Sequence, residues 1–368
     1  MSDLLRRVFN EQGQSPWLDN LQRSYVTSGT LKQLVDNGVR GLTSNPTIFQ
    51  KAIQGSSDYD DQFVEVIGQG KTPLEAYWEM VTQDIHGASA VFMDLYESSQ
   101  GLDGYVSVEV DPRLAHDSEG TLRAARELHE LVNRDNVMIK IPATLEGIPA
   151  IQTMIAEGRN VNVTLIFSLD RYQMVLDAYI NGLRDRASRG LALNNIASVA
   201  SFFISRVDNE IDKQLDANGS PEALQLRGTS AINQARLAYE IFQKAFSGAE
   251  WDSLAALGAH VQRPLWASTS TKNPAYKDTL YVDELIGPST VNTLPEATLN
   301  AFADHGVVSR TIDTHVPLAH QQWDSLANYG VDVHNISQRL EQEGVASFIA
   351  SFEDLINALI VKSEALQL

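Results

Sequence analysis

The stretch NVMIKIPAT, residues 136–144, places a single lysine inside an otherwise apolar run. Lys140 is flanked by Ile139 and Ile141, and the alternation of side chains reaches back to Val137 with the period of a β-strand. Strands that are apolar on both faces are typical of parallel sheets covered by helices. The lysine either extends to solvent or to an anion, or its amine is buried for use as a nucleophile.

Strand-like runs of this kind alternate with helical stretches along the whole chain. Helical spacing of apolar residues is clear in 118–134 and 231–246, while 29–38 offers Thr30 as a helix N-cap and Gly38 as a stop. The expected strands end near Asp19, Asn45, Glu109, Lys140, Thr164, Phe203, Ser268 and Leu294. Eight such units in 368 residues predict an α/β fold, a (β/α)8 TIM barrel.

An open, doubly wound sheet is the alternative fold. The sequence lacks the G-x-G-x-x-G or Walker-type loop that would hold a nucleotide in such a sheet. About 70 residues follow the eighth expected strand, and they read as helices over 298–306, 336–344 and 345–366. We therefore expect residues 1–368 to form one barrel domain, with additional C-terminal helices from about 297 packed on or near the barrel.

The composition excludes several classes of protein. Hydrophobic residues make up 43% of the chain and charged residues 20%, which is typical of a folded globular protein. The 47 acidic and 28 basic residues give a net charge of −19, which argues against nucleic acid as a partner. An anionic ligand would therefore need a local cluster of cations within the site.

The absence of cysteine excludes disulfides and thiolate metal sites and is consistent with a cytoplasmic protein. The N-terminus lacks a continuous apolar signal core, and apolar runs such as 199–204 are too short to span a bilayer. We therefore expect no membrane association. The eight histidines are scattered without H-E-x-x-H spacing, and we expect neither a metal nor a cofactor.

Polar side chains recur on one face of several expected strands. In the third strand Ser107 and Glu109 alternate with valines, and on the second Thr43 and Asn45 share a face. In the fifth strand, one face carries Val161, Val163 and Leu165 and the other Asn160, Asn162 and Thr164. Burying an unpartnered polar group costs about 1–3 kcal/mol. A row of such groups at the carboxyl ends of barrel strands predicts an active site, although single members could also be strand ends that enter solvated loops.

Seven segments occur in an order that resembles one family. They are SPWLDN, GLTSNPTIF, VSVEVDPRLAHD, VMIKIPAT, EGRNVNVTLIFS, VASFFISRVD and WASTSTKNP. The chain resembles the transaldolases, in their longer bacterial form, within the class I Schiff-base-forming aldolases. The resemblance implies a TIM barrel with the reactive lysine on the fourth strand, where strand counting places Lys140.

The resemblance also implies a reaction of the pentose phosphate pathway. A dihydroxyacetone unit passes from sedoheptulose 7-phosphate to glyceraldehyde 3-phosphate, giving erythrose 4-phosphate and fructose 6-phosphate. Cleavage of the C3–C4 bond leaves electrons that an imine at C2 can accept, and only a primary amine forms that imine. The apolar neighbours of Lys140 favour the free amine that must attack.

The resemblance assigns further catalytic roles residue by residue. Asp19 matches the base that takes the C4 hydroxyl proton, and Glu109 matches an acid that acts through a water held by Thr164. A carboxylate in contact with Lys140 would favour its ammonium form. We therefore expect a water between Glu109 and Lys140 instead of a direct ion pair.

The expected substrate contacts follow in the same way. Asn45 and Asn162 match groups that bind sugar hydroxyls, since an amide both donates and accepts. Ser201 and Phe203 match the pocket wall and an imine-side contact.

Arg206 matches the family's phosphate arginine. The alternative for this residue is a surface ion pair with Asp208 or Glu210. Where the family often has Ser-x-Arg, this chain has Ser270 and Lys272, with Ser268 as an alternative serine. Lysine binds phosphate as a point charge, without the fork of arginine.

Two other functions remain open at the level of sequence. A Schiff-base aldolase that releases free dihydroxyacetone would use the same lysine and differ in how the enamine is kept from water. A non-catalytic barrel that binds sugar phosphates would be expected to lack Lys140, Glu109 or Asp19, and all three are present. The sequence does not separate a monomer from a homodimer.

Overall fold

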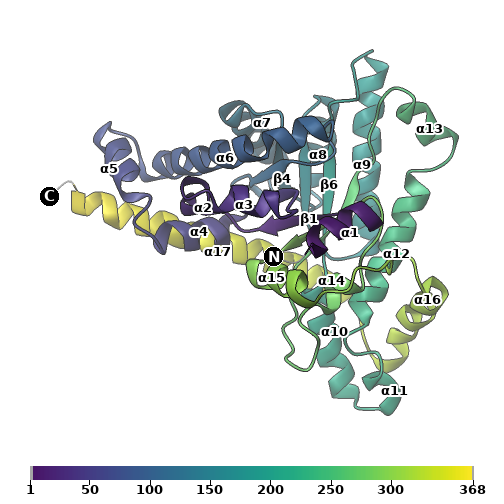
Figure 1. The fold of residues 1–368 in the computed structure, drawn as a ribbon. Helices are drawn as coiled ribbons and strands as arrows, with labels where there is room; N and C mark the ends of the chain where they lie inside the picture. Colours follow the sequence, from purple (N-terminus) through teal and green to yellow (C-terminus); the bar gives the residue numbers. More distant parts are fainter. Residues whose placement is uncertain (1–2, 367–368) are drawn as a thin grey trace.

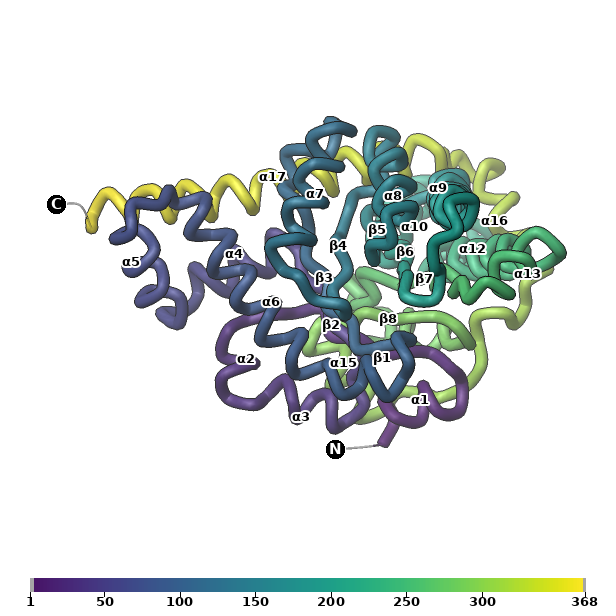
Figure 2. Tube along the Cα trace, turned by 90° about the horizontal axis from the view of Figure 1, so that it is seen from above, coloured from purple at the N-terminus to yellow at the C-terminus, as the bar shows by residue number. Residues whose placement is uncertain are grey.

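Eight parallel strands close into a barrel in the computed structural model, which describes residues 3–366 (Figure 2). Each strand pairs with the next in sequence, and β1 pairs with β8, which closes the ring. The strands are β1 (Gln14–Asp19), β2 (Gly41–Thr43), β3 (Tyr105–Glu109), β4 (Val137–Pro142), β5 (Val161–Ile166), β6 (Ser198–Phe203), β7 (Arg263–Ala267) and β8 (Thr290–Leu294). The predicted (β/α)8 barrel is confirmed, and the open sheet is excluded.

Helices surround the barrel and connect its strands (Figure 1). Up to β5 they are α1 (Leu4–Gln12), α2 (Arg23–Thr27), α3 (Thr30–Asp36), α4 (Pro46–Gln54), α5 (Asp60–Gly68), α6 (Pro73–Ser98), η1 (Pro112–Leu114), α7 (Ser118–Val132) and α8 (Gly147–Ala156). From β5 to β8 they are α9 (Leu169–Ser188), α10 (Ser205–Asn218), α11 (Pro221–Leu224), α12 (Ser230–Ala245), α13 (Ala249–Ala255) and α14 (Leu280–Asp283). After β8 come α15 (Glu296–His305), α16 (Val316–Ser325), η2 (Leu326–Tyr329) and α17 (Val333–Leu366).

Two predicted boundaries differ from the structure for local reasons. Strand β2 ends at Thr43, before Asn45, because Pro46 occupies the first turn of α4 and Asn45 caps it. Thr30 is the first residue of α3 and not its N-cap, which is Gly29 in the left-handed conformation. The Thr30 hydroxyl instead contacts that of Ser28 at 2.8 Å.

The C-terminal segment predicted as two helices is one continuous helix, α17, which crosses the barrel and runs on beside α4 and α5 (Figures 1 and 2). Gly344 at the predicted break stays helical, at a cost of about 1 kcal/mol relative to alanine. Its missing side chain leaves room for a close contact. A Cβ there would lie 3.0 Å from Leu165 Cδ2, so the glycine allows α17 to approach the end of β5.

Within residues 3–366, α17 is the one helix that has the length and hydropathy to cross a membrane. The search for continuous apolar runs in the sequence did not identify this helix. In the structure α17 packs against α4, α6 and α10. Its apolar residues Leu340, Phe348 and Phe352 are buried against the rest of the chain.

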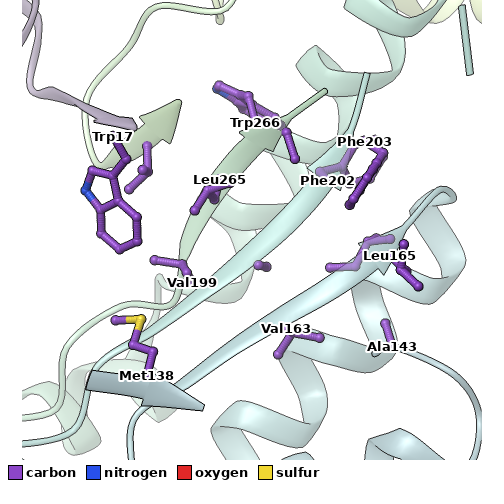
Figure 3. Packing of buried hydrophobic residues seen from close by; sticks show 14 of the residues in the cluster. Trp17, Met138, Ala143, Val163, Leu165, Val199, Phe202, Phe203, Leu265 and Trp266 are labelled. Carbon is purple, nitrogen blue, oxygen red and sulfur yellow. The ribbon is translucent and has the colours of Figure 1, made fainter. Parts of the chain in front are cut away.

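The barrel interior is apolar in its middle and polar above. Trp17, Met138, Val199 and Leu265 converge on the lumen (Figure 3). A Cβ on Gly41 would lie 2.4 Å from the Trp17 ring, so only glycine fits opposite this indole. These side chains form a solid floor beneath the polar row, as in other barrels of this kind.

The prediction that Leu165 continues the apolar, helix-facing row of β5 is wrong. Leu165 has a φ of +60°, and the pairing with β6 shifts register between Val163 and Ile166. This β-bulge takes Leu165 out of the helix-facing row and places its side chain against Gly344 of α17. The strand therefore changes direction directly after Thr164.

A buried ionic cluster closes the amino-terminal end of the barrel. Asp103 is fully buried, and its carboxylate pairs with Arg40 Nε at 2.7 Å and with Arg263 Nη2 at 3.1 Å. It also accepts from Ser15 Oγ at 2.8 Å and from Trp17 Nε1 at 3.3 Å. One carboxylate thus connects the starts of β1 and β7 with the segments that precede β2 and β3.

We expect Asp103→Ala to lower the free energy of unfolding by about 3–5 kcal/mol, because it leaves two arginines near the barrel axis without their anion. Chemical denaturation monitored by tryptophan fluorescence measures this change. The control is Glu250→Ala, which removes an exposed ion pair with Arg184 and should change stability little. Equal effects of the two variants would contradict a structural role for the cluster.

Candidate active site

A cavity of about 420 Å³ opens at the carboxyl ends of the strands. Nine of the eleven site residues predicted from the sequence line it: Asp19, Asn45, Lys140, Thr164, Ser201, Phe203, Arg206, Ser270 and Lys272. The other two, Glu109 and Asn162, are buried beside Lys140, since β4 pairs Lys140 with Glu109 on one side and with Asn162 on the other. The barrel thus gathers every predicted residue at one mouth.

The amine of Lys140 is buried with defined partners. The residue is 4% exposed, and its Nζ donates to the carbonyl of Ser44 at 3.1 Å. Glu109 Oε2 lies 3.3 Å from the same nitrogen. The prediction of a water between the two groups is therefore wrong, because neighbouring positions on β3 and β4 bring the side chains into direct contact.

Glu109 has an unusual environment for a carboxyl group. Burial raises its pKa, the nearby Lys140 opposes that rise, and Asp19 adds to it. Neither carboxyl oxygen makes a hydrogen bond with good geometry among the described residues, although Oε2 is within ion-pair distance of Lys140. A carboxyl with a raised pKa and free oxygens can hold a proton and exchange it with a neighbour.

Asp19 lies at the end of β1, where Thr43 Oγ1 donates to its Oδ1 at 2.7 Å. Burial raises the pKa of Asp19, while Lys140, the Thr43 hydrogen bond and Arg206 partly lower it. Thr43 also shares a hydrogen bond of 2.6 Å with Thr293, which fixes its hydroxyl. Two carboxyl groups with raised pKa values therefore lie near one amine, an arrangement suited to proton transfer.

Asn162 is fixed by a chain of hydrogen bonds across three strands. Ser201 Oγ donates to its Oδ1 at 2.7 Å, and its Nδ2 donates to Ser107 Oγ at 3.0 Å. Asn162 is completely buried, and only its remaining N–H and lone pair can serve a ligand. Thr164, two residues further, has a buried hydroxyl that finds no partner within residues 3–366.

Asn45 combines a structural contact with a place in the cavity wall. Its Oδ1 accepts from the backbone N–H of Ile48 at 3.0 Å and so caps α4. The amide NH₂ is not needed for the cap. It remains available as a donor in the cavity.

Arg206, in the first turn of α10, supplies a cation that acts electrostatically on Asp19 and Glu343 without pairing directly with either. Its guanidinium lies 5.2 Å from the Phe203 ring and makes no ion pair or hydrogen bond within residues 3–366. The alternative, a surface pair with Asp208 or Glu210, is wrong because both acids have other partners. Tyr281 and the N–H of Ala231 donate to Asp208, while Lys213 and Arg339 hold Glu210.

The segment after β7 supplies a second cation. Lys272 Nζ donates to Ser270 Oγ at 2.8 Å, so the pair predicted from the sequence forms one unit. Ser268 also lines the cavity, but its hydroxyl contacts that of Ser205 at 2.8 Å and its φ is +56°. Ser268 therefore connects β7 to the start of α10, and Ser270 is the serine that accompanies the lysine.

Several lining residues were not predicted from the sequence. They are Thr47, Ile48, Lys51, Ala267, Thr293, Pro295, Ser347 and Phe348. Thr293 could have been found from the alternation in β8, which places it level with Trp17. Ser347 and Phe348 come from α17, and no local pattern indicates that this helix reaches the mouth.

The fold and site define a (β/α)8 barrel with a buried lysine, two neighbouring carboxyl groups and free cations at its mouth. Comparison with known proteins agrees with this class. The family described as "Transaldolase/Fructose-6-phosphate aldolase" matches residues 16–359. This chain belongs to that family.

Individual relatives match almost the whole chain. "Transaldolase 2" of Streptomyces avermitilis is 49% identical over 97% of this chain and 96% of its own length. The "Transaldolase" of Frankia alni is 50% identical over 94% of both chains. The "Transaldolase" of Mycobacterium ulcerans is 49% identical over 96% of both.

The helix that carries Arg206 is anchored by a buried acid. Asp208 Oδ2 accepts from Tyr281 at 2.7 Å and Oδ1 from the N–H of Ala231 at 2.9 Å. Burial, with a further contribution from Asp212, raises the pKa of Asp208 to about 7. The folded protein thus keeps a proton that the unfolded chain releases above its ordinary value of 3.8.

We expect Asp208 to make the folded protein less stable as pH rises from 3.8 to about 7, by up to about 1.4 kcal/mol per pH unit. Denaturation of the wild type and of Asp208→Asn at pH 5, 6, 7 and 8 measures this. The variant should show a shallower fall, because Asp19 and Glu109 contribute equally to both proteins. Parallel pH profiles would contradict the assignment.

Proposed function

We propose that this protein is a transaldolase that carries a dihydroxyacetone unit between sugar phosphates as a Schiff base on Lys140. The single observation that supports this most strongly is the buried amine, 3.3 Å from Glu109, at the mouth of a family barrel. The relatives named above bear the name transaldolase. The donor is a ketose phosphate, and the acceptor is an aldose phosphate such as glyceraldehyde 3-phosphate.

The first step is attack of the Lys140 amine on C2 of the ketose. The carbinolamine that forms must lose water, and Glu109 is placed to supply the proton that this departure needs. The free hydroxyl of Thr164 can hold the departing water.

Cleavage follows once the imine is cationic. Asp19 accepts the proton of the C4 hydroxyl, the C3–C4 bond breaks, and its electrons enter the imine to give an enamine. The aldose phosphate departs, and the enamine attacks the aldehyde of the next aldose, with Asp19 returning the proton. The chemistry reverses through the same groups.

The sugar is held by groups at both ends of the cavity. The NH₂ of Asn45, which the helix cap does not use, can donate to a sugar hydroxyl. The fixed amide of Asn162 can bind another hydroxyl. Arg206 and Lys272 suit the phosphate, because neither makes a direct ion pair in the part of the chain that the structure describes, and the Ser270 hydroxyl can add a hydrogen bond. These cations also give an acidic protein a locally positive entrance.

A second candidate is an aldolase that releases free dihydroxyacetone, since the family description names both activities. The two functions share every step up to the enamine. They differ in whether an aldose or a proton reaches it first. Product analysis with and without an aldose acceptor separates them.

Borohydride trapping tests the covalent step. With fructose 6-phosphate, reduction should add a three-carbon unit to the peptide that contains Lys140, detectable by mass spectrometry. Lys140→Arg should abolish the adduct, because a guanidinium is not a nucleophile near neutral pH. Lys51→Arg is the matched control, since Lys51 lines the same cavity and should leave the adduct intact. An adduct elsewhere, or none, would overturn the proposal.

Removal of the free cation tests the phosphate contact. We expect Arg206→Leu to raise KM for fructose 6-phosphate about 10- to 100-fold, in keeping with the loss of hydrogen bonds to a charged group. Steady-state kinetics measures this, with inorganic phosphate as a competitor whose inhibition should weaken in parallel. Lys213→Leu removes an exposed cation of the same helix that is paired with Glu210, and should leave KM unchanged. An unaltered KM in Arg206→Leu would exclude the contact.

A further inference from the structure

Phe348 covers the amine of Lys140 from the C-terminal helix. Its ring centroid lies 5.8 Å from Lys140 Nζ, and the side chain is 4% exposed. It lines the cavity together with Ser347, although both come from a helix outside the eight barrel units. Of the two residues of α17 that line the cavity, Phe348 is the apolar one.

The position of Phe348 is fixed one turn before it and one turn after it. Four residues earlier, a Cβ at Gly344 would lie 3.0 Å from Leu165 and 3.6 Å from Arg206, so the helix rests directly on the site. Three residues later, Ser351 Oγ contacts Thr47 Oγ1 at 2.8 Å. These contacts hold α17 to the bulge of β5 on one side and to α4 on the other.

The enamine that cleavage leaves on Lys140 has two fates. In transfer, C3 attacks the aldehyde carbon of an aldose, the new C–C bond gives the product imine, and water then hydrolyses that imine to free the ketose and the amine of Lys140. In release, C3 takes a proton, water adds to C2 of the resulting imine, and the C–N bond breaks. That path returns the free amine of Lys140 and one molecule of dihydroxyacetone, and it consumes one water.

We propose that Phe348 is a specificity-determining residue whose ring keeps proton-donating water from C3 of the enamine on Lys140, so that the enamine waits for an aldose acceptor. This inference rests on the proposed Schiff-base function. The ring is apolar and rigid, so it offers no hydrogen bond that would hold a water on its side of the nitrogen. Exclusion of water from a reactive intermediate is an established way to suppress its hydrolysis.

The matched variants are Phe348→Leu and Phe352→Leu. Phe352 lies one turn further on α17 and is also buried, but its ring packs against Tyr77 and Trp78 away from the cavity. The same change at the two positions therefore costs comparable packing and differs in distance from Lys140. Phe348→Met, which keeps more of the side-chain volume, serves if the leucine variant does not fold.

The measurement is the ratio of dihydroxyacetone released to sedoheptulose 7-phosphate formed, with fructose 6-phosphate as donor and erythrose 4-phosphate as acceptor. We expect Phe348→Leu to raise this ratio about tenfold, which corresponds to about 1.4 kcal/mol between the two barriers. In heavy water, the released dihydroxyacetone should carry one deuterium on the carbon that was C3 of the donor, and the amount of this labelled product should rise with the ratio. Phe352→Leu should keep the wild-type ratio even if its total rate falls.

Each outcome has a distinct meaning. If Phe348→Leu lowers both rates equally and keeps the wild-type ratio, Phe348 is a packing residue only and this inference is overturned. If the ratio rises equally in both variants, general loosening of α17 explains it, and the specific role of the ring is likewise overturned. If the wild type gives neither a trapped adduct on Lys140 nor sedoheptulose 7-phosphate, the proposed function itself fails.

Discussion

Contact between Lys140 and Glu109 is the interaction on which the rest of the site depends. The amine and the carboxyl group are buried 3.3 Å apart. Burial raises the pKa of Glu109, and the charge of Lys140 lowers it. Such a pair is stable only inside a rigid frame, because a lone buried charge is costly. The barrel provides that frame through pairing of β3 and β4 and through the Ser44 carbonyl, which accepts from the amine.

Much of the frame could be predicted from the sequence because it depends on local periodicity. Alternation in the third, fourth and fifth strands separated lumen-facing from helix-facing residues, and the count of units placed Lys140 on β4. The one failure of this alternation is Leu165, where the bulge changes the register. The bulged residue packs against Gly344 of α17, a contact between distant parts of the sequence of which alternation alone gives no sign.

Details of the site depended on tertiary contacts and were harder to predict. The separation of Glu109 and Lys140 follows from strand register, which a sequence read one strand at a time does not specify. Arg206 was recognised by resemblance, yet the absence of an ion pair with Asp208 follows from the way Tyr281 and Ala231 donate to that carboxylate. Phe348 was missed altogether, because its helix lies about 200 residues from Lys140 in the sequence.

The placement of α17 has a consequence for biosynthesis. The helix that covers the mouth is synthesised after all eight strands, and it docks on α4, which lies between β2 and β3 in the sequence. A nascent chain that has completed its eight strands therefore still exposes to solvent the apolar surface around the cavity that α17 later buries. Such exposed surface is where growing chains aggregate. Removal of α17 would thus impair yield as well as chemistry.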